Sequence, residues 1–390
     1  MTRTSVLIVD DEKGVQTSVQ GILEDAGYKA LAVSSGEEAL EMLAEEKYPV
    51  VLLDIWLPGI DGLQTLAKIR QSAPEVVVIM ISGHGSIETA VRSTKLGAFD
   101  FVEKPLSLEK TLLVVKNAFH QYQLEEENRN LRKQIEQEHV MIGDSVPMQA
   151  LRQQIAFAAP TNGRVLICGE NGTGKELVAH LLHIQSLRRD GPFVEMNCAA
   201  IPEELIESEL FGHLKGSFTG ASENKEGKFV QAHGGTLFLD EVGDMSLSAQ
   251  AKVLRALQEN KITRVGSDKD INVNVRIIAA TNKNLKSEIE KNTFREDLYH
   301  RLSVILIQVP TLNERLEDIP LLAEHFNRQI AEEYGTSPKV IQEGAIGELQ
   351  KINWTGNIRE FRNVLERLII LCEKEITGND VISFAMPISK

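Results

Sequence analysis

The sequence predicts two α/β units in succession, followed by a smaller helical unit. Short apolar runs alternate with helix-like patterns over the first 120 residues, and the same alternation returns between residues 164 and 310. Strands that are apolar along their whole length are typical of parallel sheets covered by helices on both faces. After Pro310 the pattern is helical to about residue 374. We therefore expect four segments: 1–120, a helical linker at 121–140, an α/β core at 141–310 and an all-α unit at 311–390.

The composition is that of a globular protein and sets limits on its partners. The 390 residues are 42% hydrophobic and 25% charged, with a formal net charge of -14. An acidic chain is not expected to bind DNA by broad neutralisation of phosphates. The three cysteines are scattered, which predicts buried thiols in a reducing compartment rather than a zinc site. With no apolar run of 18 residues and no signal-peptide pattern, we expect a cytoplasmic protein without a membrane segment.

The first unit opens with an apolar run at residues 5–9, and helix-like patterns follow at 13–26 and 36–46. Three more strand-like runs come after these patterns: VVLLD at 50–54, VVVIMIS at 76–82 and FDFVEKP at 99–105. This order predicts a parallel sheet whose strands are joined by helices.

Polar side chains end the strand-like runs of the first unit. They are Asp10, Asp11, Asp54, Ser82 and Lys104. The carboxyl ends of parallel strands form the ligand crevice of an open sheet. Three carboxylates at this edge repel one another unless a cation such as Mg²⁺ lies among them, and the serine and lysine suit a phosphoryl group. One such residue alone is more often a cap, but the complete set favours a phosphoryl site.

Residues 107–139 predict one long helix whose second half is highly charged. Leu124, Asn128, Leu131 and Ile135 are spaced four, three and four residues apart, as in a coiled-coil seam with one asparagine. Two interpretations stay open: a solvated linker helix, or a short parallel coiled coil in a dimer.

The second unit contains a glycine-rich loop between a strand and a helix. Its strand-like runs are RVLIC at 164–168, FVEMN at 193–197, TLFLD at 236–240 and VRIIAA at 275–280. GENGTGKE follows the first run and precedes the helical run ELVAHLLH. Gly169, Gly172 and Gly174 allow backbone N–H groups to converge on phosphate at a helix N-terminus. Lys175 would contact the β- and γ-phosphates of a nucleotide.

An acidic pair and polar strand ends complete the predicted nucleotide site. Asp240 suits Mg²⁺ binding, and Glu241 suits polarising the attacking water. Asn282 ends the next strand and could orient water or phosphate. Glu176 stands where most such loops have the Ser or Thr that holds Mg²⁺, so the metal would depend on the acidic pair or on water.

Three arginines are candidates for sensing the nucleotide. Arg295 and Arg301 lie in FREDLYHRL, and Arg359 lies in GNIRE. Surface helices often carry arginines for solubility alone. In a ring of subunits, however, an arginine from the neighbouring copy can stabilise charge on the γ-phosphate.

The segment GSFTGA, residues 216–221, predicts a loop that bends freely at its glycines. Phe218 either folds back as a core anchor or forms an exposed tip that meets a partner.

The first unit resembles the response-regulator receiver family over residues 3–120, which implies a CheY-like, flavodoxin-like fold. The resemblance makes Asp54 the phospho-acceptor. It also implies a metal site made by Asp10, Asp11, Asp54 and the backbone carbonyl of Trp56. Ser82, Lys104 and Phe101 would be the switch residues, and the Lys104–Pro105 peptide bond would be cis.

Residues 141–385 resemble the AAA+ P-loop ATPase domain, with its helical lid, of the bacterial enhancer-binding proteins that activate sigma-54 RNA polymerase. The phrases ELFGHLKGSFTGA, GGTLFLDEVG, FREDLYHRL and NWTGNIRE carry this resemblance, and GENGTGKE is that family's own form of the loop. It implies ATP binding by Gly169, Glu170, Asn171, Gly172, Thr173, Gly174, Lys175, Glu176, Asn282 and Arg359.

The same resemblance assigns roles to further residues. Asp240 and Glu241 would be the Walker B pair, with Asp240 on the metal, and Asn197 would restrain Glu241. Arg295 and Arg301 would act on a neighbouring subunit. The sigma-54 contact would be Gly216, Ser217, Phe218, Thr219, Gly220 and Ala221.

The order of the segments resembles NtrC- and NtrX-type nitrogen regulators. It implies a transcriptional activator whose ATPase, with ATP and Mg²⁺, remodels the sigma-54 RNA polymerase holoenzyme after a sensor histidine kinase has phosphorylated Asp54. It also implies a homodimer when inactive and a hexameric ring when active. No segment resembles the C-terminal helix-turn-helix domain of such regulators, so we expect no autonomous DNA-binding domain in this chain.

Two alternatives are less favoured by the residues. In the first, the chain is a non-catalytic adaptor, which the intact Lys175, Asp240 and Glu241 argue against. In the second, it is a general AAA+ motor acting on other substrates, which the GSFTGA phrase argues against.

Overall fold

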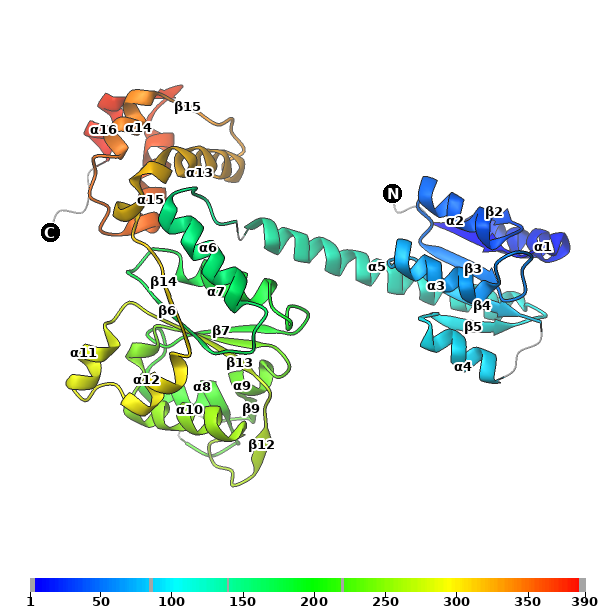
Figure 1. Cartoon of the computed structure of the whole chain (residues 1–390), viewed down its shortest axis with the longest axis horizontal. Coiled ribbons are helices and arrows are strands. Elements are labelled where there is room, and N and C mark those ends of the chain that lie inside the picture. The colour runs from blue at the N-terminus through cyan, green and yellow to red at the C-terminus, as the bar shows by residue number, and fades with distance from the viewer. Residues whose placement is uncertain (1–3, 84–86, 139, 219–220, 386–390) are drawn as a thin grey trace. The chain divides into compact units, whose positions relative to one another are not determined.

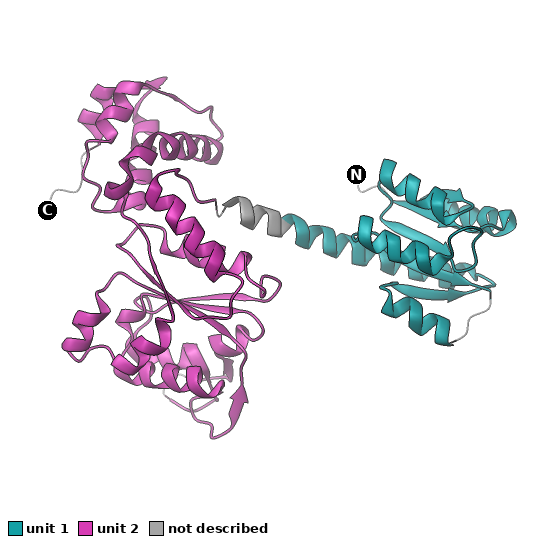
Figure 2. Cartoon of the chain, viewed as in Figure 1, with its two compact units in different colours: residues 1–137 teal, residues 138–390 magenta. Residues whose placement is uncertain are grey.

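A computed structural model describes residues 4–83, 87–138, 140–218 and 221–385 of the chain. The chain divides into two compact units, residues 1–137 and residues 138–390 (Figure 2). None of the helices in the described part combines the length and the apolar character that crossing a bilayer requires.

Unit 1 is a parallel sheet of five strands in the order β2-β1-β3-β4-β5 (Figure 1). This is the flavodoxin-like order: β2 is added on one side of β1, and β3, β4 and β5 are added on the other side. The elements are β1 Ser5–Val9, α1 Lys13–Asp25, β2 Lys29–Val33, α2 Gly36–Glu45, β3 Val50–Asp54, α3 Gly62–Ser72, β4 Val77–Ser82, α4 Ile87–Lys95, β5 Asp100–Glu103 and α5 Leu108–Glu138.

Alternate residues of the unit 1 strands face two separate cores. Leu7 and Val9 of β1 pack in the core that also contains residues of α2 and α3, whereas Val6 and Ile8 pack with α1 and α5. Because both faces are covered, the strands are apolar at successive positions, as the sequence indicated. Strand β2 was not predicted, since its sequence KALAV lies at the sheet edge and is only partly buried.

Helix α5 has almost the predicted extent. Its first half packs in the unit 1 core through Val114, Val115 and Ala118. Leu124 and Asn128 of the predicted seam are exposed, which both interpretations of the linker allow. The side chains of Leu131 and Ile135 lie outside the described residues.

Unit 2 begins with a second parallel sheet, in the order β14-β6-β13-β10-β7. Helices α6 and α7 cover one face and α8, α10 and α12 the other, each with its own core. Strand β14 was not predicted; it pairs only with β6, at the sheet edge, and its Ile305 and Leu306 are not fully buried. The elements are α6 Val146–Ala158, β6 Val165–Cys168, α7 Lys175–Ile184, β7 Phe193–Asn197, α8 Glu203–Phe211, β8 Gly212–His213, β9 Lys225–Glu226, α9 Lys228–Gln231, β10 Thr236–Asp240, α10 Leu247–Glu259, β11 Lys261–Thr263, β12 Asp270–Asn272, β13 Arg276–Thr281, α11 Leu285–Glu290, α12 Glu296–Leu302 and β14 Ile305–Gln308.

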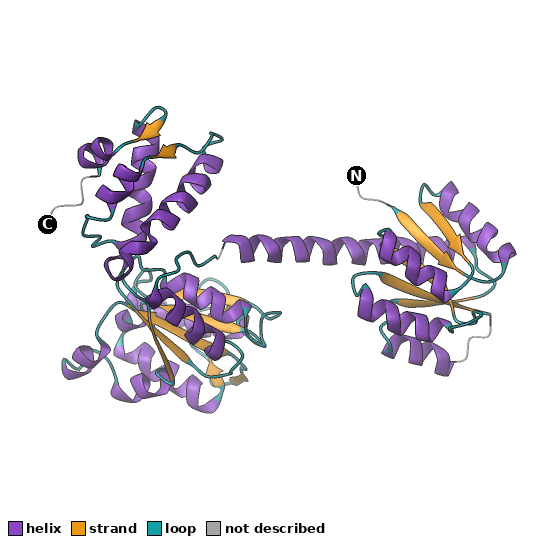
Figure 3. Ribbon diagram, turned by 45° about the horizontal axis from the view of Figure 1, so that its top comes forward, coloured by secondary structure: helices purple, strands orange, loops and turns teal. Residues whose placement is uncertain are grey.

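The last part of unit 2 is a mainly helical lid, as expected (Figure 3). Its core is built around the fully buried Trp354, which meets Phe361 edge to face with ring centroids 5.1 Å apart. Two short strands that were not predicted, β15 Val340–Ile341 and β16 Glu375–Ile376, pair in parallel beside the helices. The other elements are a 3₁₀ segment at Leu312–Asp318, α13 Ile319–Glu333, α14 Glu343–Leu349, α15 Asn357–Leu371 and α16 Gly378–Phe384.

Gly62, the first residue of α3, lies directly under the end of β3. A Cβ atom at this position would stand 2.0 Å from the carbonyl oxygen of Asp54, which is backbone and cannot rotate away. We therefore predict that Gly62→Ala destabilises unit 1 by about 2 kcal/mol, as overpacking does in other cores. Hydrogen exchange of the β1 and β3 amides in the full chain should become about thirtyfold faster.

Gly21→Ala is the matched control. Gly21 lies inside α1, and a Cβ there would meet no atom within 4 Å. Alanine favours the helix by about 0.5–1 kcal/mol over glycine, so exchange should slow or stay unchanged. Equal exchange rates for both variants would contradict the close packing of α3 against β3.

Candidate phosphoryl and nucleotide sites

The polar residues at the strand ends of unit 1 meet around Lys104. Its Nζ atom lies 2.6 Å from Oδ2 of Asp54, 2.9 Å from Oδ2 of Asp10 and 3.3 Å from Oε1 of Glu12. Burial raises the pKa of Asp10, and the hydrogen bond from Lys104 opposes this. Burial also works against the charge of Lys104, but the hydrogen bonds to Asp54 and Asp10 outweigh it and raise the lysine pKa. The lysine thus neutralises two buried carboxylates.

The carboxylates of this pocket form an oxygen-rich group. Ligand atoms of Asp10, Glu12 and Asp54 all lie within 4.8 Å of one another. Hard carboxylate oxygens are the ligands that Mg²⁺ prefers, so the donor set fits this ion. Glu12 was not predicted, while the predicted Asp11 is exposed and lies outside the group. The reason is local: β1 ends at Val9, and Glu12, the N-cap residue of α1, reaches Lys104 with its side chain.

The remaining predicted residues of unit 1 surround the pocket. The backbone N–H of Trp56 donates to Oδ1 of Asp54 at 3.3 Å, while the indole is 66% exposed. Ser82 is buried at the end of β4, and its carbonyl accepts from the backbone N–H of Lys104. Phe101 is half-buried on β5, against the core that also contains α2 and α3. The Lys104–Pro105 peptide bond is cis, as expected.

In unit 2 the glycine-rich loop surrounds Lys175, the first residue of α7. The side chain is only 7% exposed. Its Nζ atom donates to the carbonyl of Gly169 at 3.1 Å and lies 3.1 Å from Oε1 of Glu241. Gly172 and Gly174 have φ angles of 77° and 99°, in the region that favours glycine.

The acidic pair lies at the carboxyl end of β10, as predicted: Asp240 is its last residue and Glu241 follows. Glu241 has a positive φ of 49°, and its Oε2 accepts from the backbone N–H of Asn282 at 3.0 Å. Burial, and next the charge of Glu241, raise the pKa of Asp240. Asn197 donates to Oδ2 of Asp240 at 3.4 Å, so in the structure its amide contacts the aspartate rather than the expected Glu241. The parallel pairing of β7 with β10 explains this, because Asn197 is directly opposite Asp240.

Two adjoining cavities lie beside the loop. One, of about 430 Å³, is lined by Lys175, Asp240, Glu241, Asn197 and Arg359 and suits phosphates. The other, of about 370 Å³, is more apolar and shares walls with it, among them Phe326. The sequence reasoning missed this second cavity. Its wall includes residues 140–142, and the short apolar run VMI after the charged linker was the available signal.

Asn357, the first residue of α15, joins the lid to the loop. Its Nδ2 donates to Oε2 of Glu170 at 3.0 Å and to the carbonyl of Asn171 at 3.1 Å, and its Oδ1 accepts from the N–H of Leu312 at 2.8 Å. It is fully buried with a φ of 54°, a conformation that asparagine tolerates better than most residues. Arg359, two residues later, was predicted from the sequence, whereas Asn357 was not.

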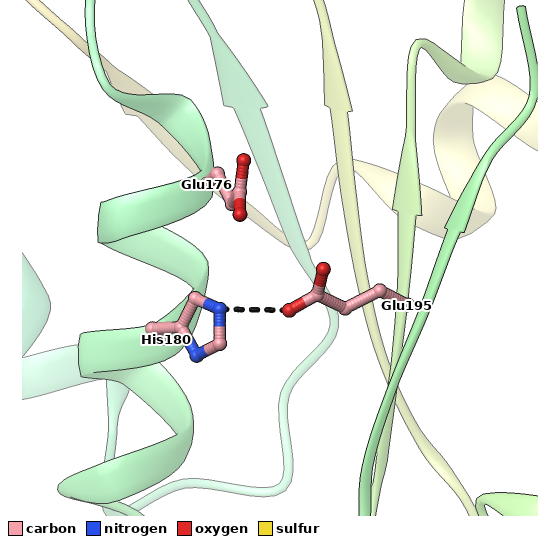
Figure 4. Close-up of side chains that lie close together, drawn as sticks. All are labelled: Glu176, His180 and Glu195. Carbon is pink, nitrogen blue, oxygen red and sulfur yellow. Dashed lines mark ion pairs between the residues drawn. The ribbon is translucent and has the colours of Figure 1, made fainter. Parts of the chain in front are cut away.

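Glu176 projects from the first turn of α7 toward a second polar group (Figure 4). One helical turn on, Nε2 of His180 lies 2.7 Å from Oε1 of Glu195, which comes from β7. The ligand atoms of the three residues lie within 4.8 Å of one another. The His180–Glu195 pair joins α7 to β7, and Glu176 also lines both cavities.

Arg295 and Arg301 lie apart from the two cavities beside Lys175. Arg295 is exposed and makes two hydrogen bonds to the carboxylate of Asp297. Arg301 is half-buried and donates to the carbonyl of Leu257 at 3.2 Å. Neither lines the two cavities beside Lys175.

The described residues of the 216–221 segment form no helix or strand, and Phe218 packs against His213 rather than standing free. The ring meets His213 edge to face with centroids 5.0 Å apart, and Phe218 is half-buried. The N–H of Gly216 donates to the carbonyl of Ala221 at 2.9 Å, which closes the base of the loop. Thr219 and Gly220 lie outside the described residues.

Comparison with known families identifies three matching regions. Residues 6–116 match the response regulator receiver domain, residues 141–308 match the sigma-54 interaction domain, and residues 313–386 match an AAA+ ATPase lid domain.

Known proteins resemble the chain over nearly its whole length. The nitrogen assimilation regulatory protein NtrX of Azorhizobium caulinodans is 46% identical over 380 residues, covering 96% of this chain and 83% of NtrX. The transcriptional regulatory protein ZraR of Escherichia coli is 42% identical over 385 residues, covering 98% and 86%. A crystal structure of NtrX from Brucella abortus in complex with ATP is 43% identical with a TM-score of 0.79, covering 99% of this chain and 86% of that chain.

We predict that Asn357→Gly weakens the binding of a non-hydrolysable ATP analogue about tenfold. Glycine keeps the positive φ angle but removes two hydrogen bonds that hold the lid against the loop and one within the lid, each worth about 0.5–1.5 kcal/mol. Titration calorimetry on the full chain measures the change.

Asn292→Gly is the control, because Asn292 also has a positive φ, 57°, but is exposed and does not line the cavities. Its affinity should match the unmodified chain. An unchanged affinity in Asn357→Gly would show that this side chain does not position the lid.

Proposed function

The chain belongs to the response regulators that carry a sigma-54 interaction domain, and we propose that it couples ATP hydrolysis to the remodelling of sigma-54 RNA polymerase holoenzyme. Members of this family are transcriptional activators under phosphorylation-controlled, two-component regulation. We also propose the domain boundaries expected above: a receiver at 1–120, a linker at 121–140, an ATPase core at 141–310 and a lid at 311–390.

The observation that carries the proposal is the convergence of Lys175, Asp240, Glu241 and Arg359 on one cavity. An ATP molecule there would place its phosphates against the glycine-rich loop and its base in the adjoining apolar cavity. The crystal structure of the Brucella abortus NtrX with ATP supports this choice of nucleotide.

Each residue of the site has a distinct task in hydrolysis. Lys175 would leave Glu241 to contact the β- and γ-phosphates, and Glu241 would then polarise the attacking water. Asp240 would hold Mg²⁺, which neutralises charge developing on the phosphates. Asn197 would restrain Glu241, and it also contacts the neighbouring Asp240. Arg359 would report the nucleotide state to the lid.

In the receiver, Asp54 would accept a phosphoryl group from a sensor histidine kinase. The candidate holders of Mg²⁺ are the predicted Asp10, Asp11, Asp54 and carbonyl of Trp56, together with Glu12. The clustered oxygens of Asp10, Glu12 and Asp54 fit this ion. Lys104 already contacts Asp54 and would pair with a phosphoryl oxygen after transfer. Ser82 and Phe101 would respond as switch residues.

Phosphorylation would change the assembly of the protein. We propose a homodimer in the resting state and a hexameric ring in the active state. Only a ring brings Arg295 or Arg301 to the nucleotide of a neighbouring copy, because neither lines the cavities beside Lys175 in its own chain.

The first prediction of this function concerns the receiver. Addition of beryllofluoride, a phosphoryl mimic, should raise ATP turnover several-fold and shift the mass from dimer toward hexamer, since the mimic biases one of two arrangements. Turnover assays and light scattering on the same samples measure both.

Two variants serve as controls. Asp54→Asn should not respond to the mimic. Glu241→Gln should bind ATP without turnover, whereas a non-catalytic adaptor would keep its activity in this variant. Equal turnover and equal mass with and without beryllofluoride would refute the proposal.

The second prediction concerns the 216–221 loop. Phe218→Ala should keep ATP hydrolysis but abolish opening of a sigma-54 promoter complex, because the phenyl side chain would no longer be available to contact the polymerase. Thr219→Ala should act alike. Permanganate footprinting of promoter DNA detects the open complex.

Phe157→Ala is the matched control, because Phe157 is 79% exposed on α6 and is not part of the loop. It should leave both activities unchanged. Open complexes formed at the normal rate by Phe218→Ala would contradict the assigned contact.

A further inference from the structure

A second polar cavity lies at the end of the unit 2 sheet opposite to the cavities beside Lys175. It has a volume of about 330 Å³ and is lined by residues that precede strands β6, β13 and β14, such as Gly163, Val275 and Val304. It therefore lies at the amino ends of the parallel strands, whereas Lys175 and Glu241 lie at their carboxyl ends. Four arginines line it, and no aspartate or glutamate does: Arg164, Arg188, Arg276 and Arg301.

Two of these arginines are tied to the backbone. Arg276 is 2% exposed and donates to the carbonyls of Ala158 and Ala159, both at 2.8 Å, at the end of α6. Arg188 donates to the backbone and side-chain oxygens of Asn274 at 3.1 and 2.7 Å. They supply positive charge, but most of their donors are committed.

The other two arginines share one acceptor. Arg164 and Arg301 both donate to the carbonyl of Leu257, at 3.4 and 3.2 Å, near the end of α10. A guanidinium has five N–H donors, so this single carbonyl leaves most of them available. The Nε atom of Arg301 is buried and has no hydrogen-bond partner among the described residues.

The positive charges of the cavity are not balanced by nearby carboxylates. Burial, and next the charge of Arg301, lower the pKa of Arg164. Burial, and next the charge of Arg188, lower the pKa of Arg276 to about 10. Neither Arg164, Arg276 nor Arg301 forms an ion pair among the residues that the structure describes.

A purely structural role explains only part of this arrangement. One arginine near the end of α10 suffices to satisfy a free helix carbonyl and to oppose the negative end of the helix dipole. A second guanidinium at the same carbonyl adds repulsion, and a buried donor without a partner adds a desolvation cost of about 1–3 kcal/mol. An anion between the two would remove both penalties.

We propose that this cavity binds a phosphate-bearing anion and that Arg164 and Arg301 are its direct ligands. Planar guanidinium groups bind phosphate oxygens in pairs, which suits two of them facing one cavity. Two sources can supply the phosphate: a nucleotide held by a neighbouring copy, or a free anion in solution. The first source rests on the ring proposed above and makes Arg164 a second arginine acting in trans.

The direct test measures binding of inorganic pyrophosphate to the full chain by titration calorimetry. Lys175→Ala removes the lysine of the nucleotide site, and EDTA removes divalent cations from the receiver. Pyrophosphate should bind in this background, and adding Arg164→Gln or Arg301→Gln should each weaken binding at least about tenfold.

Arg255→Gln is the matched control. Arg255 also lies on α10 but is exposed and paired with Glu259, so pyrophosphate affinity should not change. Arg164→Lys and Arg301→Lys, which keep the charge, guard against loss of folding and should bind with intermediate affinity. Equal affinity in all arginine variants, or no binding in the Lys175→Ala chain, would overturn the proposal.

Mixing experiments then distinguish the two sources. Arg164→Gln subunits keep their own hydrolytic residues, and Glu241→Gln subunits keep their arginines. If the anion is a neighbour's nucleotide, a mixture should hydrolyse ATP faster than the sum of the separate variants. If it is a free anion, pyrophosphate binding persists without such recovery. Because the calorimetry needs no ring, failure of the ring proposal would not be confused with failure of this one.

Discussion

In a parallel sheet covered on both faces, charged side chains fit best at the ends of the strands. This constraint determines where the polar sites lie in both units. Strands β3 and β4 are buried at every position, and each is apolar until its last residue, Asp54 or Ser82, at the carboxyl end of the sheet. Strand β10 is buried from Thr236 to Leu239 and delivers Asp240 in the same way. An unpaired ion buried in the middle of a strand costs several kcal/mol, so the acidic residues lie where the strands end.

Crowding of acids at one edge requires a counter-charge, and each unit supplies a lysine. Lys104 contacts Asp10 and Asp54, and Lys175 contacts Glu241. In each case the lysine pairs with a carboxylate that the proposed chemistry needs. A phosphoryl group or a nucleotide bound as proposed would compete for the same ammonium group, so ligand binding and release of the carboxylate would be one event. Because one anion would replace another beside the lysine, the charges of each pocket would stay balanced with and without the ligand.

The sequence was most informative where residues are buried on both sides or belong to a fixed phrase. The central strands, the glycine-rich loop and the acidic pair were all recognisable because fully apolar runs end in polar residues. Edge strands β2 and β14 were not, since half of their surface faces water and their pattern is mixed. Contacts between distant segments were also beyond reach. That Asn357 bonds to Glu170, or that Asn197 contacts Asp240, depends on how helices and strands are brought together, and no local spacing encodes it.

The ring of Phe218 packs against His213, as expected of an anchor, and its contact with a partner stays a prediction. An edge-to-face pair is worth only about 0.5–1.5 kcal/mol, so releasing the ring would change the equilibrium by roughly tenfold. The residues on which Phe218 packs are themselves closely packed. His213 is buried and hydrogen-bonded to Ser208 at 2.7 Å, and a Cβ on Gly266 would stand 2.6 Å from Cβ of Ser217. A weak contact of this kind would suit a loop that moves with the nucleotide state, as proposed above. A small bias from the ATP site would be enough to release the side chain of Phe218, whereas a fully buried anchor would hold it in place.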